Sequence, residues 1–327
     1  MPYEKLASAE NILKGNLASA WNILEGTSGD YTDLGIARRF GGAAAAYSLR
    51  DIGAMNGRVV RVRRSSDSQE EDFSANQVAS GVLETFVGSG NDGFVTKWYD
   101  QSGNNRPLIQ ATTSEQPSIV ENGVFLDGVK ADVATSNSTM KNLQVSTDGT
   151  TPNFGTDDWA NGGTKLGLMY VGKITDSFAN NKNCVFWGGG RGVSGYQSGG
   201  LSLQILKQGT DNWKLINERQ GLSPSITAES ALLNTDEDVV CYGTADNRDF
   251  TIKVNNVSSS ATESADLDTR EDAAISLFGA YSNSSTSNYH QRSTAGVCKE
   301  CYLFSGDNIA EIDTIATEIN KHYNIYS

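Results

Sequence analysis

Residues 97–111 read Lys97-Trp98-Tyr99-Asp100-Gln101-Ser102-Gly103-Asn104-Asn105-Arg106-Pro107-Leu108-Ile109-Gln110-Ala111. A short apolar run ends in two aromatic residues, enters a turn rich in Asp, Ser, Gly and Asn, and leaves as a second apolar run. Asp and Ser side chains hydrogen-bond their own backbone in such turns, and Gly103 adopts a positive φ at little cost. The stretch therefore predicts an ordered loop between two strands.

The composition favours a β-rich protein. Hydrophobic residues make up 38% of the chain, and 34 Gly stand against 5 Pro and 2 His, which fits many tight turns and little histidine chemistry. The net charge of −13 supplies no basic stripe for phosphates, so we expect no nucleic-acid partner. The start of the chain lacks the basic and apolar regions of a signal peptide, and no apolar run approaches the roughly 20 residues of a membrane span. We therefore expect synthesis in a host cytoplasm and no membrane insertion, and the four cysteines suit a reducing compartment.

Residues 1–40 differ from the rest of the chain. The segment 6–16 is echoed by 17–26 as an imperfect LASAxNILxGx repeat with apolar residues at helical spacing. One interpretation is a pair of short amphipathic helices packed on the main domain. The other is an anchor that docks on a neighbouring subunit, since so small an element cannot bury its own apolar stripe. The docking residues would then be Leu13, Leu17, Trp21 and Leu24.

From residue 41 onward the pattern is typical of strands separated by turns, with no alternating helices. The predicted strands cover 57–64, 94–99, 166–174, 184–187, 201–206, 213–217, 238–243, 250–254, 274–278 and 296–304. Residues 310–323 read as a closing helix, with Ile312, Ile315, Ala316 and Ile319 on one face. No linker divides 41–327, so we predict one mainly β domain, an antiparallel concanavalin A-like sandwich, behind the segment 1–40.

Residues 98–111 resemble the WYDQSGNGxxLxQA signature shared by the catalytic sandwich of the arabinofuranosidase B family and by a group of bacteriophage virion proteins. Further segments follow both patterns in order: 42–50 resembles the GAAAAYSLRxL opening of the phage group, 62–73 the VRRSSD element of both groups, and 116–120 the NQPxIV ending. The region 239–326 resembles a laminin-G-like or concanavalin A-like domain of phage proteins. The resemblance is strong over 41–125, weak over 165–327, and does not include the N-terminal repeat.

The resemblance to arabinofuranosidase B implies two catalytic carboxyl groups, because a retaining glycosidase needs a nucleophile and an acid/base about 5 Å apart. The family nucleophile follows a Cys-Cys-Phe segment that resembles 184–188, which puts it on 200–205. The acid/base follows a Gly-rich strand end that resembles 277–283. Neither window contains Asp or Glu. We therefore expect no catalytic residues and no enzymatic activity.

Other chemistry receives little support. Cys298 and Cys301 have CxxC spacing, but residues three apart in a strand point to opposite faces, so half-buried structural cysteines are favoured over a metal or redox site. The acidic runs 70–72, 157–158 and 236–238 have no EF-hand spacing. A solvated surface is favoured over a Ca²⁺ site, so no metal or other cofactor is expected.

Aromatic and amide side chains in two loop-like segments have the composition of sugar-binding sites, where rings stack on sugar faces and amides bond hydroxyls. The predicted carbohydrate contacts are Trp187, Tyr196, Gln197, Tyr281, Asn283, Asn288 and Tyr289. The alternative is that Trp187 and some of the tyrosines belong to the core.

These features together favour a phage virion structural protein, located in the particle. Its N-terminus would dock on capsid or tail proteins, and its lectin-like sandwich would decorate the particle or attach it to a host-surface glycan, as a homo-oligomer such as a trimer. The alternative is a glycoside hydrolase of arabinofuranosidase B type, and a third option is an architectural subunit that binds no sugar.

Overall fold

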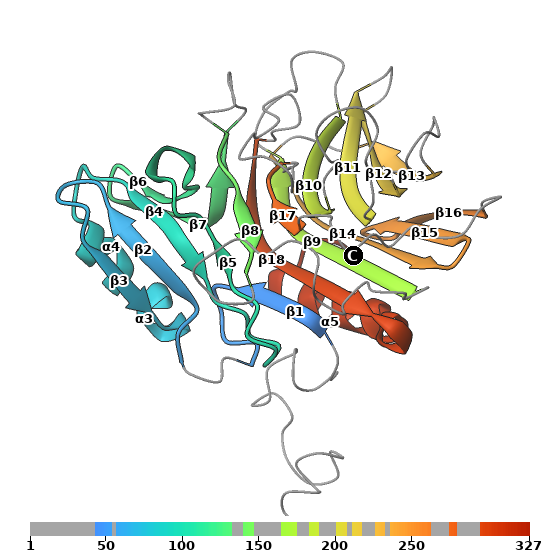
Figure 1. Ribbon diagram of the computed structural model, residues 1–327, viewed down its shortest axis with the longest axis horizontal. Coiled ribbons are helices and arrows are strands. Elements are labelled where there is room, and N and C mark those ends of the chain that lie inside the picture. Colours follow the sequence, from blue (N-terminus) through green and yellow to red (C-terminus); the bar gives the residue numbers. More distant parts are fainter. Residues whose placement is uncertain are drawn as a thin grey trace, which may run out of the picture.

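The computed structural model describes residues 43–53, 57–132, 140–146, 165–174, 183–189, 201–207, 211–217, 226–232, 236–262, 275–279 and 295–327. The predicted docking residues therefore lie outside the described part of the chain. Hydrogen bonds join the eighteen described strands in one curled antiparallel network (Figure 1), which confirms the predicted mainly β, sandwich-like fold.

One layer of the sandwich has the strand order β1-β18-β9-β14-β15-β16. Its strands are β1 (Ala43–Ser48), β9 (Lys165–Ile174), β14 (Asp238–Asp246), β15 (Asp249–Val254), β16 (Val257–Thr262) and β18 (Gly296–Ser305). The central strand β9 is buried on both faces: Leu168 and Tyr170 face the core between the layers, while Met169 and Val171 face the other side. Alternate side chains point to opposite faces, so a strand covered on both sides must be apolar throughout.

The second layer has the strand order β5-β8-β17-β10-β11-β12-β13. Its strands are β5 (Leu108–Ile109), β8 (Leu143–Val145), β10 (Asn183–Gly189), β11 (Leu201–Lys207), β12 (Asp211–Asn217), β13 (Ile226–Leu232) and β17 (Ile275–Leu277). Trp187 and Tyr47 meet edge to face between the layers, with ring centroids 5.8 Å apart. The indole Nε1 of Trp187 donates to the Tyr302 carbonyl at 2.8 Å and so links the two layers.

A smaller lobe, drawn in blue and cyan in Figure 1, projects from one end of the sandwich. It contains β2 (Val60–Arg64), β3 (Glu70–Phe73), α3 (Ala75–Ala79), α4 (Val82–Val87), β4 (Gly93–Trp98), the 3₁₀ turn η2 (Thr113–Glu115) and β6 (Ser118–Glu121). The long strand β7 (Val124–Ala131) pairs with β6 and with β18 and ties the lobe to the sandwich. The short helices are not predicted by periodicity, although Ser74 and Gln77 form a capping box that marks the start of α3.

The closing helix is confirmed as α5 (Ile312–Tyr323), preceded by the 3₁₀ segment η5 (Gly306–Glu311). The predicted apolar face of α5 is buried against the outer face of the first layer. Asn324 ends the helix at φ 52°. Asn320 Oδ1 then accepts from the backbone N–H groups of Ile325 and Tyr326, both at 2.9 Å, which folds the C-terminus back onto the helix. Within the described residues, no helix combines the length and hydropathy that crossing a membrane requires.

The loop after β4 fastens the small lobe to β1. Asp100 Oδ1 accepts from Ala46 N–H and Ser102 N–H, both at 2.9 Å, and Asp100 Oδ2 accepts from Ser102 Oγ and from Arg106 N–H. Gln101 is 1% exposed. Its Nε2 donates to the Ser48 carbonyl and its Oε1 accepts from Ile52 N–H. The signature therefore acts as a clamp that pairs its own side chains with the backbone of a strand far away in sequence.

The two aromatic residues of the signature have different environments. Trp98 is fully buried in the core. Tyr99 is half-buried, and its hydroxyl donates to Asp72 Oδ1 at 2.7 Å while the Arg58 guanidinium lies over its ring. Successive residues of a strand point to opposite faces, so only one of the pair can enter the core.

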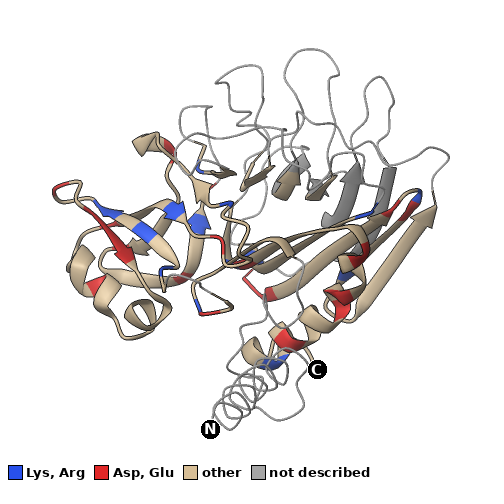
Figure 2. Ribbon diagram, turned by 60° about the horizontal axis from the view of Figure 1, so that its bottom comes forward, with Lys and Arg blue, Asp and Glu red and all other residues tan. Residues whose placement is uncertain are grey.

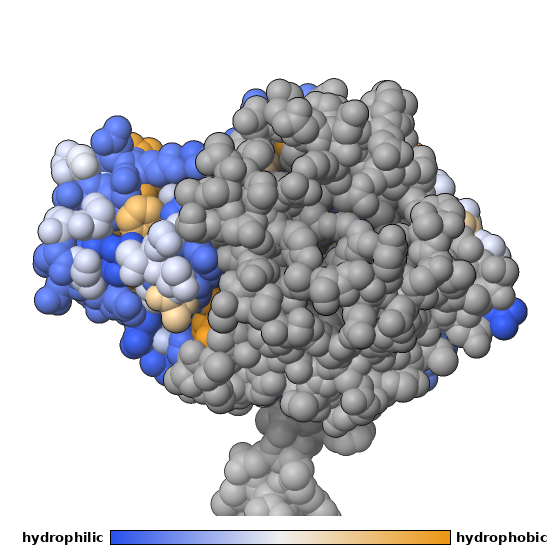
Figure 3. Space-filling model, turned by 45° about the horizontal axis from the view of Figure 1, so that its top comes forward, coloured by the Kyte–Doolittle hydropathy of each residue, from blue (hydrophilic) through white to orange (hydrophobic). Residues whose placement is uncertain are grey.

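Charged residues gather unevenly on the described surface. Figure 2 shows basic residues along β2, in the small lobe. They are paired with acids: Arg58 and Arg61 both reach Asp72, and Arg64 reaches Asp67 at 2.6 Å. Figure 3 shows that the small lobe is largely hydrophilic on the face drawn there. The ion pairs therefore offset part of the positive charge along β2.

Candidate functional site

A row of small and polar residues crosses four neighbouring strands of the second layer. The register places Gln144 of β8 opposite Ser276 of β17, Ser276 opposite Gly188 of β10, and Gly188 opposite Ser202 of β11. Residues directly opposite one another in antiparallel strands share a face of the sheet. Neighbouring strands lie about 4.8 Å apart, so Ser202 and Ser276 are separated by roughly 10 Å across the glycine.

The adjacent row shows which face this is. Leu143, Leu277, Trp187 and Leu203 stand opposite one another in the same four strands. All four are fully buried in the core between the layers. Alternation along each strand therefore assigns the polar row to the other face of the second layer, away from the core. We call Gln144, Ser276, Gly188, Ser202 and the nearby Gln204 the polar row.

Gly188 cannot be replaced without moving a strand. Its φ is +121°, and a Cβ there would lie 2.4 Å from the Leu201 carbonyl oxygen and 2.7 Å from Ser202 Cα. Glycine is the residue that adopts this backbone conformation while lying so close to another strand. A Cβ would also lie 2.9 Å from Leu168 Cδ1 of the core, so only glycine fits at this position between Ser276 and Ser202.

Two amide oxygens of the polar row are unusual. Gln204 Nε2 donates to Ser202 Oγ at 2.6 Å, and Gln144 Nε2 donates to Asn142 Oδ1 at 3.0 Å. The Oε1 atoms of both glutamines are buried and have no hydrogen-bond donor among the described residues. A buried acceptor without a donor costs about 1–3 kcal/mol and calls for a functional reason. A ligand that brings hydroxyl groups would satisfy both oxygens.

Further buried polar residues extend the row toward the small lobe. Asn142 Oδ1 also accepts from Gln110 Nε2 at 3.1 Å, and the Gln110 carbonyl accepts from Gln116 Nε2. Gln116 Oε1 in turn accepts from Arg63 Nε at 2.8 Å. Each of these four side chains is less than a tenth exposed. This connected network holds the amide groups of β8 in one orientation, which is the preorganisation a binding site needs.

The structure brings the two predicted catalytic windows together. The window 200–205 covers most of β11, the window 277–283 begins at the end of β17, and β10 pairs with both strands. Their described positions hold Ser202, Gln204 and Leu277 and no carboxylate. The nearest acid by register is Glu229, since Gln204 pairs with Lys214 of β12 and Lys214 pairs with Glu229 of β13. The two windows are far apart in the sequence, so their proximity follows only from the pairing of β10 with β11 and with β17.

Trp187 is the one predicted carbohydrate contact among the described side chains. It is 0% exposed and packs against Tyr47 in the core between the layers, so the core interpretation holds for this residue. The other six predicted contacts lie outside the described residues: Tyr196, Gln197, Tyr281, Asn283, Asn288 and Tyr289.

The cysteines differ from their predicted half-buried state. Cys298 and Cys301 are both fully buried in the core, because the pairing of β18 with β9 shifts register between Cys298 and Glu300. This bulge places both thiols on the same side of the strand. Burial raises the pKa of the Cys301 thiol well above its usual range, so the thiolate that redox or metal chemistry requires is disfavoured.

The acidic runs are engaged in ion pairs where the structure describes them. Asp72 pairs with Arg61 at 2.7 Å and Asp238 with Lys299 at 2.8 Å, while 157–158 lies outside the described residues. No group of three or more His, Cys, Asp or Glu side chains suited to a metal ion occurs in the described part of the chain.

Comparison with known proteins identifies the relatives of this arrangement. The model of the family "Alpha-L-arabinofuranosidase B, catalytic" matches residues 39–296. An arabinofuranosidase complexed with arabinofuranosyl-α-1,2-xylobiose has a similar fold, with a TM-score of 0.53 and 16% identity over 84% of this chain. A glutamine mutant of a GH54 α-L-arabinofuranosidase soaked with 4-nitrophenyl α-L-arabinofuranoside gives a TM-score of 0.54 and 17% identity, again over 84% of this chain. In both cases the chain spans 62% of the length of the solved protein. No curated protein sequence matches.

These matches correct two predictions. The prediction of a phage virion structural protein is wrong, because the family match and the structural neighbours point to arabinofuranosidase catalytic domains, and no comparison points to a virion protein. The prediction that the chain is not an enzyme is contradicted by the same findings, including a GH54 structure soaked with a cyclic sulfate inhibitor. The error came from reading two short windows for acids without knowing which other strands lie beside them.

Proposed function

The chain belongs to the family of α-L-arabinofuranosidase B catalytic domains, and on this premise we propose that it is a glycoside hydrolase that releases arabinofuranosyl units from glycans. The observation that carries the proposal is the family match over 39–296, which includes the whole polar row. The buried glutamine oxygens without donors support it, since a sugar offers hydroxyl groups at short spacing.

The polar row would bind the sugar. Ser202 and Ser276 flank the side-chain-free position at Gly188, and a furanose ring would lie over this position. Its hydroxyls would donate to Gln204 Oε1, on the strand next to Gly188, which has no donor among the described residues. Buried leucines and Trp187 support the strands from the core side, so the hydrogen-bonding groups keep their spacing when the sugar enters.

Hydrolysis with retention requires two carboxyl groups. One carboxylate attacks the anomeric carbon while the other carboxyl donates its proton to the departing glycosidic oxygen. Water then attacks the glycosyl-enzyme bond, gives its proton to the second carboxylate, and frees the first. The described part of the polar row holds no carboxylate, so the two acids would come from elsewhere in the matched region. The candidates to be tested are Glu229, two strands from Gln204 by register, and Glu271 and Asp272, which precede β17 in the sequence.

The test is hydrolysis of 4-nitrophenyl α-L-arabinofuranoside by the purified chain, followed by absorbance of the released nitrophenol. The variants Glu229→Gln, Glu271→Gln and Asp272→Asn are compared with the wild type. We expect Glu229→Gln and one of the other two to lower kcat by about a hundredfold or more, as the loss of an acid or base does. Asp249→Asn is the matched control, because Asp249 is exposed and bonds Thr262 on the outer hairpin β15–β16.

Two results would overturn the proposal. The first is sugar binding without any release of nitrophenol by the wild-type protein. The second is full activity in all three acid variants, which would remove the candidate residues from the reaction. Proton NMR of the first-formed sugar anomer tests the stereochemistry separately.

A further inference from the structure

A cavity lies between the small lobe and the sandwich, and none of its lining residues belongs to the polar row. Its volume is about 310 Å³, at the lower end of the range for small-molecule sites. Five elements or their flanking loops contribute to its wall: the end of β1, α3, β7, β18 and α5. The lining residues on which the argument depends are Leu49, Arg50, Phe125, Asp127, Lys299 and His322.

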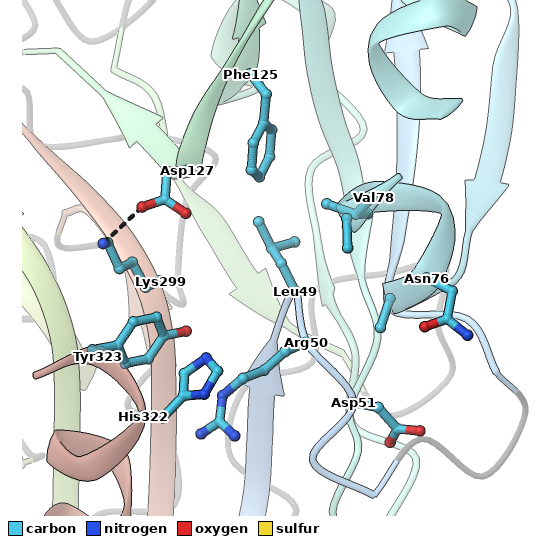
Figure 4. A pocket seen from close by; sticks show the side chains of 12 residues that line it. Leu49, Arg50, Asp51, Asn76, Val78, Phe125, Asp127, Lys299, His322 and Tyr323 are labelled. Atoms are coloured by element: carbon cyan, nitrogen blue, oxygen red, sulfur yellow. Dashed lines mark ion pairs between the residues drawn. The ribbon is translucent and has the colours of Figure 1, made fainter. Parts of the chain in front are cut away.

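The cavity has one apolar and one polar side (Figure 4). Leu49, Val78 and Phe125 form the apolar side, and Val78 belongs to the short helix α3. Lys299 and His322 lie on the polar side, where Tyr323 adds an aromatic ring. The His322 and Tyr323 rings meet edge to face with centroids 4.6 Å apart. Such a pair of walls matches a molecule with a carbon-rich face and a hydroxylated edge.

Both cations that line the cavity are paired with carboxylates. Lys299 Nζ lies 2.7 Å from Asp127 Oδ2 and 2.8 Å from Asp238 Oδ2. Arg50 is bound by Glu300 through both of its oxygens. Because each of these cations already has a carboxylate partner, an anionic ligand would find no uncompensated cation among them. A neutral ligand with hydrogen-bonding groups fits this electrostatic environment better.

The polar side is held in a fixed arrangement. The buried Glu300 accepts from Arg50 Nη2 at 3.1 Å and from the Tyr323 hydroxyl at 2.9 Å, which ties the end of β1 to α5. Asp127 adopts a left-handed φ of 55°. The next residue, Gly128, lies so close to β18 that a Cβ would stand 2.8 Å from the Cys298 carbonyl oxygen. The kink directs Asp127 toward Lys299 on β18. A site with fixed polar groups loses little entropy when a ligand binds.

We propose that this cavity binds a neutral sugar residue, separate from the unit bound at the polar row. The inference rests on the proposed function, because a hydrolase of branched glycans presents several sugar units to its surface at once. The sugar would lay its carbon-rich face on Leu49, Val78 and Phe125. Its hydroxyls would bond Asn76, Asp127 and His322, which are exposed.

The test uses the imidazole NMR signals of the protein, because the chain has only 2 His and His322→Ala assigns the signal of the cavity. The wild type is titrated with arabinofuranosyl-α-1,2-xylobiose in one arm and with free L-arabinose in the other. We expect a saturable shift of the His322 signal with the trisaccharide, and a shift with L-arabinose only if the bound unit is the pentose itself. No shift in either arm refutes the proposal.

A cavity-filling variant makes the test specific. Ala79 lines the cavity from an exposed position on α3, so Ala79→Trp fills the space without burying a new residue in the core. Val82→Trp is the matched control, because Val82 is 40% exposed on the neighbouring helix and does not line the cavity. We expect the His322 shift to be lost in Ala79→Trp and kept in Val82→Trp. An unchanged shift in Ala79→Trp would contradict the proposal.

The hydrolysis assay separates this proposal from the proposed function. Ala79→Trp is expected to hydrolyse 4-nitrophenyl α-L-arabinofuranoside at the wild-type rate, since that small substrate occupies the polar row alone. Hydrolysis in all proteins with no His322 shift would refute the cavity site and leave the proposed function standing. A His322 shift lost in Ala79→Trp, with no hydrolysis in any protein, would support the cavity site and refute the function.

Discussion

Glu300 is a buried carboxylate on which four side chains converge, and its replacement by glutamine is the most informative stability experiment. The side chain is 0% exposed. It accepts from Ser48 Oγ at 3.0 Å, Tyr302 OH at 2.5 Å and Tyr323 OH at 2.9 Å. Arg50 donates to both carboxylate oxygens. The shape of glutamine is nearly the same, but one oxygen becomes an NH₂ group that cannot accept any of these bonds.

The structure sets the size of the effect. If the amide nitrogen replaces Oε2, Arg50 Nη2 and Tyr302 OH each face a donor, and Arg50 loses its counter-charge. Breaking a buried ion pair by removing one partner costs about 3–5 kcal/mol. The Arg50 side chain keeps 23% exposure, so water compensates part of the loss and we expect about 3 kcal/mol. For a chain of this size each kcal/mol lowers Tm by about 2 °C, which predicts a fall of roughly 6 °C.

The assay is urea unfolding followed by tryptophan fluorescence, with Tm measured by circular dichroism. Glu318→Gln is the matched control, since Glu318 bonds Lys321 at 2.7 Å on the surface of α5, and an exposed pair contributes at most about 1 kcal/mol. An unfolding free energy for Glu300→Gln within about 1 kcal/mol of the wild type would show that Glu300 is not the centre of a coupled network.

Three further predictions concern the signature loop, the small lobe and the polar row. Asp100→Ala removes four hydrogen bonds that hold the loop against β1 and the turn, and we expect about 2–4 kcal/mol less stability in urea. Asp100→Asn, which keeps one acceptor oxygen, should lose less. Burial works against ionisation of Asp72, yet hydrogen bonds from Arg61, Tyr99 and Arg58 lower its pKa to about 2. Its stabilising contribution is therefore present above the ordinary Asp pKa near 4 and disappears as the pH falls toward 2. Unfolding free energies measured between pH 5 and pH 2 should fall more steeply for the wild type than for Asp72→Asn, and parallel curves would contradict this. Gln204→Met retains the shape of a side chain whose Oε1 has no donor among the described residues, so we expect stability within about 1 kcal/mol of the wild type. Its KM for 4-nitrophenyl α-L-arabinofuranoside should rise several-fold, and an unchanged KM would exclude Gln204 from sugar binding.

Local patterns predicted most of the sandwich. Apolar runs such as 166–174 and 296–304 correspond closely to β9 and β18, because a strand buried on both faces is apolar throughout. The face of α5 was read correctly from Ile312, Ile315 and Ile319, since its amphipathic period is local. The short helices α3 and α4 were missed, because five or six residues are too few to show a period.

The candidate site could not be predicted from local sequence patterns. Ser202 lies on β11 and Ser276 on β17, and five other strands lie between these two in the sequence. Both serines nevertheless pair with the same glycine, Gly188. Their windows were identified by resemblance, but the described positions of both windows hold no acid, and Glu229 on β13 stands two strands from Gln204 by register. Similarly, the CxxC spacing gave the wrong geometry for Cys298 and Cys301, because a bulge imposed by pairing with β9 shifts the alternation.

By itself, the sequence determined which segments are strands, which face of the closing helix is apolar, and the turn chemistry of Asp100 and Ser102, because all of these depend on neighbours within a few residues. The tertiary structure alone decided that Trp187 is a core residue, that a polar row crosses four strands, and that Glu300 joins β1 to α5. The physical reason is that strand order and register are set by long-range hydrogen bonds and by burial between layers, and these bring together side chains that no local pattern connects.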